Sequence, residues 1–177
     1  MSQKTFSLRY LNEDDRAYGL AGMVISLASL HAIDRVAQVS LDSEGPMVEF
    51  SHEYYFSGSP SISPKTTWDN LVHNFHLTTS MVVSNILART LVRLKEDAPE
   101  DILKKVYGEV EREGVDTCAL ETDEVESLYN NALKRSMRLF RNPRLHPAVD
   151  EFARIISLKR SLSGREILDE LEQLELI

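Results

Sequence analysis

The apolar positions at the start of the chain change from a two-residue spacing to a helical one. Within Lys4–Leu11 every second side chain is apolar, which is typical of a short β-strand. Asn12 then provides a capping side chain, and the acids behind it suit the first turn of a helix. We therefore expect an N-terminal strand followed by a helix from about Glu13 to Asp34.

The next stretch, residues 36–56, fits two structures. Val36–Leu41 continues the helical spacing of the residues before it and would extend the helix. It would also pair with Met47–Phe56 as a β-hairpin, because alternate positions there are aromatic or β-branched and a Gly-Pro turn lies between. We expect the hairpin, with the extended helix as the alternative.

From Thr66 onward the apolar spacing is helical throughout. Proline is favoured at the first position of a helix, and Ser163 with Glu166 matches a capping box. The helices expected there are 67–95, 99–113, 123–140, one from Pro147 and one after Ser163. The prediction is a mainly α fold, a bundle of about six helices with a small β-hairpin and an N-terminal strand; an α+β fold is the alternative.

Length and composition indicate one folded domain. A chain of 177 residues, 42% hydrophobic and 27% charged, is large enough to bury a core and is not of the disordered class. The segment 57–64 (SGSPSISP) is rich in Ser, Gly and Pro. We expect residues 1–177 to form a single domain, with 57–64 a flexible loop between an N-terminal helix-and-hairpin part and a C-terminal all-helical part.

Nothing in the pattern favours a membrane or secreted protein. The run Ala17–Ile33 lacks a formal charge, but it is only as long as the shortest membrane spans and contains Ser and His. It is better explained as a buried core helix. The N-terminus lacks the apolar core of a cleavable signal, and one cysteine, Cys118, suits a reducing compartment. We expect a cytoplasmic protein.

The charges are unevenly distributed. The whole chain has a net charge of −8, yet residues 134–165 hold nine of its 20 Lys and Arg and only two acids. The candidate basic patch is Lys134, Arg135, Arg138 and Arg144. Such a patch attracts RNA, another phosphate ligand or an acidic partner. Alternatively, the acidic segment 96–126 and the acidic last helix neutralise it internally.

One short motif lies inside that basic segment, at the junction of two expected helices. Arg141 can hold a phosphate through paired hydrogen bonds, and His146 can move a proton near neutral pH. The residues Arg141-Asn-Pro-Arg-Leu-His146 resemble the Arg-Asn-x-x-x-His motif of HEPN-type helical domains, many of which are dimeric ribonucleases. The resemblance covers six residues and implies that Arg141 and His146 catalyse RNA cleavage without a metal, supported by Asn142. The alternative is an exposed interhelix loop in which His146 caps the following helix.

Histidines and acids also recur at helical spacing near two expected helix ends. If the first helix packs antiparallel to the long helix, these residues lie at one end of the bundle. Imidazole and carboxylate groups together suit zinc or another transition metal. The candidate ligands are His31, Asp34, Asp69, His73 and His76.

Glycine-rich phosphate loops, dinucleotide fingerprints and metalloprotease or hydrolase motifs do not occur in this sequence. We therefore expect a cytosolic helical binding module without an active site of its own and without a cofactor. It would bind a protein partner or itself as a dimer, or RNA through residues 134–165. The first alternative is the HEPN-like ribonuclease using Arg141 and His146, and the second is a metal-binding helical bundle.

Overall fold

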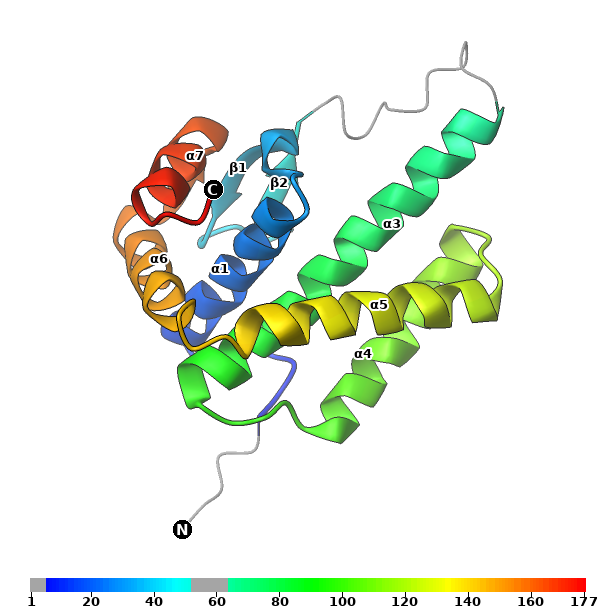
Figure 1. Ribbon diagram of the computed structural model, residues 1–177, viewed down its shortest axis with the longest axis horizontal. Coiled ribbons are helices and arrows are strands. Elements are labelled where there is room, and N and C mark those ends of the chain that lie inside the picture. The colour runs from blue at the N-terminus through cyan, green and yellow to red at the C-terminus, as the bar shows by residue number, and fades with distance from the viewer. Residues whose placement is uncertain (1–5, 52–63) are drawn as a thin grey trace.

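The computed structural model describes residues 6–51 and 64–177, with the side chains of 64–67 and 69 excepted. The fold is mainly α with a small antiparallel sheet, as expected (Figure 1). Its helices are α1 Glu13–Ser29, α3 Pro64–Leu87, α4 Glu100–Arg112, α5 Thr122–Phe140, α6 His146–Lys159 and α7 Gly164–Gln173. Short helical segments follow three of these: η1 Ile33–Arg35, η2 Ala88–Leu94 and η3 Glu113–Thr117, the last two with π-helical hydrogen bonding.

The hairpin predicted for residues 36–56 is confirmed in its described part, 36–51, while residues 52–56 lie outside the described residues. Strand β1 (Val36–Ser40) pairs antiparallel with β2 (Val48–Phe50). A third strand, β3 (Ser161–Ser163), adds to the other edge of β1 and gives the order β2-β1-β3. The predicted loop at 57–64 lies outside the described residues except for Pro64, which opens α3.

The expected N-terminal strand does not form in residues 6–11, where the described chain has turns and irregular structure. The reason is the buried guanidinium of Arg89. It donates hydrogen bonds to the carbonyl oxygens of Ser7 and Leu8 at 2.8 and 3.3 Å and to that of Arg9 at 3.1 Å. These carbonyls are therefore paired with a side chain and not with a neighbouring strand.

Helix α1 forms the centre of the bundle and packs against α3 and α6 (Figure 1). It runs antiparallel to α3, since the Ser26 hydroxyl donates to the Ser80 carbonyl while Gly22 lies against Ser84 and Ala88. A Cβ atom on Gly22 would lie 2.5 Å from the Ser84 carbonyl oxygen, so glycine allows this close crossing. Within the described part of the chain, no helix combines the length and apolar character that a membrane span requires.

Candidate anion-binding site

Four of the nine cations in residues 134–165 are in ion pairs. Their partners are Asp97 for Arg141, Glu151 for Arg154, Glu170 for Lys159, and Glu13 and Asp42 for Arg160. The internal neutralisation by residues 96–126 and the last helix, considered from sequence, therefore applies to Arg141 and Lys159. Arg154 and Arg160 pair with acids outside those two segments. Lys134, Arg135, Arg138, Arg144 and Arg165 form no ion pair with any residue in 6–51 or 64–177 whose side chain is described.

Three of these unpaired cations share one side of α5, and we call Lys134, Arg135 and Arg138 the basic face. The helical spacing explains this, because positions three and four apart lie on the same side of a helix. The opposite side of α5 is buried through Val125, Tyr129, Ala132, Ser136 and Phe140. Ser136 packs against α3, where its hydroxyl lies 2.9 Å from that of Ser84. The core contact with α3 thus turns the basic face outward.

A pocket of about 380 Å³ lies beside the basic face, and we call it the His76 pocket. Its lining residues are His76 of α3 and Asn131, Lys134, Arg135 and Arg138 of α5. In the sequence, the cations and His76 belong to two different candidate sites. The packing of α3 on α5 brings them together, and no local pattern marks a contact between residues so far apart in the chain.

His76 is half-buried, and its Nδ1 atom is buried without a hydrogen-bond partner among the described residues. Burial lowers the pKa of the imidazole, and the nearby charges of Arg135 and His73 lower it further. The ring is therefore neutral at physiological pH, since even an unperturbed histidine is mostly neutral there. A neutral imidazole among cations can accept or donate one hydrogen bond at its other nitrogen, Nε2.

The residues of the Arg141–His146 motif lie at the junction of α5 and α6 as predicted, and the side chains of Arg141 and His146 each contact a protein group. The Arg141 guanidinium donates to Asp97 at 3.1 Å. Nε2 of His146 donates to the Phe140 carbonyl at 2.7 Å, and Nδ1 lies 3.5 Å from Nζ of Lys95. His146 thus caps the end of α5, whereas the interhelix-loop alternative had it capping α6.

Two other members of the motif, Asn142 and Arg144, lie in the turn between α5 and α6. The Asn142 side chain accepts a hydrogen bond from the Arg144 amide at 3.1 Å, which shapes the turn between the helices. Arg144 itself is exposed. Arg141 and His146 both contact the turn that follows η2, at Asp97 and Lys95 respectively.

The antiparallel packing assumed for the metal hypothesis is present, but the ligands do not converge in the described part of the chain. Within that part, no group of three or more His, Cys, Asp or Glu side chains is placed to hold a metal ion. His31 follows α1 with a left-handed backbone (φ 55°), and His73 is exposed. The Asp69 side chain lies outside the description, so the full ligand set stays a prediction.

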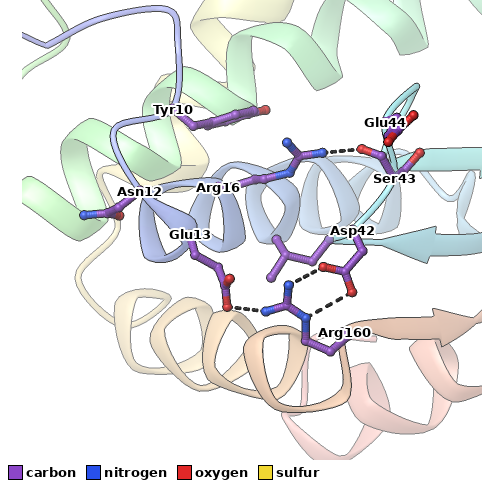
Figure 2. Close-up of a pocket in the computed structure, with 9 residues that line it drawn as sticks. Tyr10, Asn12, Glu13, Arg16, Asp42, Ser43, Glu44 and Arg160 are labelled. Carbon is purple, nitrogen blue, oxygen red and sulfur yellow. Dashed lines mark hydrogen bonds and ion pairs between the residues drawn. The ribbon is translucent and has the colours of Figure 1, made fainter.

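A second pocket, of about 460 Å³, lies where α1, the β1–β2 turn and the end of α6 meet (Figure 2). Arg160 crosses it and forms ion pairs with Glu13 and Asp42 (Figure 2). The guanidinium of Arg16 donates to the Ser43 carbonyl at 2.5 Å and lies over the Tyr10 ring. Acids and bases here are largely paired with one another, so this pocket serves to join elements of the fold.

The His76 pocket differs from this second pocket in the balance of its charges. Three of its five lining residues are cations, and none of the five is an acid. That composition suits an anion with several oxygen acceptors, of which phosphate is the commonest in biology.

No family model, no curated protein and no solved structure matches this chain. The resemblance of Arg141–His146 to HEPN-type domains therefore stays a prediction carried by six residues. The function has to be argued from the chain's own side chains and their surroundings.

Proposed function

We propose that this protein is a binding module without an active site of its own, and that it binds an RNA strand through the basic face of α5. One observation carries the proposal. Four other cations of the segment have acidic partners, whereas Lys134, Arg135 and Arg138 lie close together on one helix with none among the described side chains. Like charges at this spacing weaken a helix slightly. An external polyanion would supply the missing partners.

The rest of the molecule limits where RNA would bind. With a net charge of −8, the surface as a whole repels a polyanion. Contacts would therefore be few and confined to the basic face, giving modest affinity that depends strongly on salt. Binding of a protein partner and self-association, which the sequence also suggested, stay predictions.

The test measures fluorescence anisotropy of a labelled single-stranded RNA at increasing salt. With three phosphates contacted, log K should fall against log salt with a slope of about −2. The variant K134Q/R135Q/R138Q should lose both the binding and this slope. The matched control is K104Q/K105Q/R112Q, which removes three exposed cations from α4 and should bind like the wild type. An equal loss of RNA affinity in both triple variants, or no RNA binding by the wild type at low salt, would refute the proposal.

Metal-independent RNA cleavage by Arg141 and His146 is a second candidate function. It is supported by the position of both side chains against one turn, where Lys95 places an ammonium group beside the imidazole. Arg141 would hold the phosphate and His146 would move the proton. Both would first have to release Asp97 and Lys95.

The cleavage test compares wild type with His146→Gln on a mixed-sequence RNA, at low salt and without added metal. Glutamine keeps a donor for the Phe140 carbonyl but cannot shuttle a proton, so the fold should survive while any cleavage is lost. His73→Gln, an exposed histidine on α3, is the matched control. Cleavage that persists in His146→Gln would show that this residue is not the catalyst.

A further inference from the structure

The His76 pocket collects hydrogen-bond donors from two helices at one place. Lys134, Arg135 and Arg138 contribute charged donors, and Asn131 contributes a side-chain amide on the same side of α5. Asn131 lies three and four residues before the first two cations, which places it one helical turn away on the same side. The pocket is thus a compact cationic site and not a long basic track.

The imidazole of His76 adds a donor because of how the ring is buried. Its Nδ1 atom has no hydrogen-bond partner among the described residues and no contact with solvent. A buried N–H without an acceptor is rarer in proteins than an unsatisfied lone pair, so the ring proton belongs on Nε2. The part of the ring left to line the pocket therefore carries an N–H that can donate to an oxygen of a bound anion.

We propose that the His76 pocket binds a terminal phosphate, a phosphate monoester at one end of an RNA strand. This inference rests on the proposed function and specifies which part of the RNA is recognised. A terminal phosphate carries a charge of about −1.5 to −2 near neutral pH and has three free oxygens. An internal phosphodiester carries a single negative charge, and the next phosphate groups lie farther along the strand. Three cations in one pocket match the more highly charged group.

The size of the pocket agrees with this ligand. About 380 Å³ is near the lower end of small-molecule sites, which range from about 300 to 1,000 Å³. It holds a phosphate together with part of the sugar that carries it. The remaining strand would lie outside, along an exposed surface.

The experiment uses one RNA sequence in three forms, with a 5′-phosphate, a 3′-phosphate or hydroxyls at both ends. Affinity is measured for the wild-type protein, His76→Phe and the control His73→Gln. One phosphorylated form should bind at least about tenfold more tightly than the hydroxyl form, the effect of one charge-assisted hydrogen bond. That preference should fall clearly in His76→Phe, where the three cations alone remain to attract the terminal phosphate, and should stay unchanged in His73→Gln. Thermal unfolding of each variant shows whether it is folded.

The His76→Gln variant separates donation from packing, since glutamine retains a donor of similar reach. The His76→Gln variant should therefore recover part of the preference for the phosphorylated RNA that is lost in His76→Phe. Inorganic phosphate should compete with binding of the preferred end. Whichever end is preferred identifies the phosphate that enters the pocket.

The two proposals fail in different ways. If all three RNAs bind equally and binding still requires the basic face, the pocket inference is wrong and the RNA-binding proposal stands. If none of the three binds at low salt, both are wrong. A preference for a phosphorylated end that is as large in His76→Phe as in the wild type would also overturn the assignment to this pocket.

Discussion

At the scale of single residues, the Arg89 guanidinium joins several segments of the described structure through hydrogen bonds and ring contacts. It is fully buried in η2 and forms two hydrogen bonds with the Asp15 carboxylate, at 2.7 and 2.9 Å. It also lies over the rings of Phe6 and Tyr10. Through these contacts, one side chain ties the end of the long helix to both α1 and the N-terminal segment.

The acid dependence of stability should report this buried pair. Burial acts to raise the pKa of Asp15, but hydrogen bonds from Arg89 and the Leu11 amide, with the charges of Arg89 and Arg93, lower it overall. A lowered folded-state pKa stabilises the protein above the unfolded value, near 4, and this stabilisation is lost as the pH falls through the folded value. Asp15→Asn mimics the protonated group and leaves Arg89 unpaired, costing about 3–5 kcal/mol at neutral pH.

The measurement is the free energy of unfolding in urea for both proteins from pH 7 downward. The difference between them should be largest at neutral pH and shrink below about pH 4. Asp14→Asn is the control, because Asp14 pairs with Arg93 but is 64% exposed and should cost no more than about 1 kcal/mol. A difference that stays constant down to pH 2 would show that ionised Asp15 does not stabilise the fold.

At the scale of elements, the helix caps follow from local sequence, whereas contacts between distant segments do not. Asn12 caps α1 by accepting from the Asp15 amide at 2.8 Å, and Ser163 forms the predicted capping box with Glu166. Both interactions span three residues and are visible in sequence. Strand β3 pairs with β1, more than a hundred residues away, and only three residues form it. The meeting of His76 with the basic face likewise depends on packing between helices.

Two glycines in helices should respond in opposite directions to alanine. Gly22→Ala places a methyl group 2.5 Å from the Ser84 backbone oxygen, so α1 and α3 must separate, at about 1–3 kcal/mol. Gly108→Ala in α4 meets no atom within 4 Å and should stabilise by about 0.5–1 kcal/mol through helix propensity. Thermal unfolding of both variants tests this prediction, since the melting temperature should fall for Gly22→Ala and rise for Gly108→Ala. Similar shifts of the same sign would contradict the close crossing of α1 and α3.

At the scale of the whole molecule, the fold separates charges that could have neutralised one another. The acidic segment 96–126 supplies Asp97 to Arg141, and α7 supplies Glu170 to Lys159. The basic face has no such partner in the part of the chain that the structure describes. Composition predicts that acids and bases are available to pair, but helix rotation decides which of them meet. The mainly α class and the residues of the candidate basic patch could be predicted from the sequence, but which cations stay exposed without an acidic partner could not.

A surface kept for binding should not be optimised for stability. In K134Q/R135Q/R138Q the removal of like charges at helical spacing should leave stability unchanged or raise it by a few tenths of a kcal/mol at low salt. In K104Q/K105Q/R112Q two helical ion pairs, Lys104 with Glu100 and Arg112 with Glu109, are lost, so stability should fall by similar amounts per pair. Urea unfolding at low and high salt measures the free energy of unfolding of the two triple variants. Salt should diminish the gain in the first variant and the loss in the second. If the basic-face variant were instead clearly destabilised, these cations would have a structural partner, and the RNA-binding proposal would lose its main support.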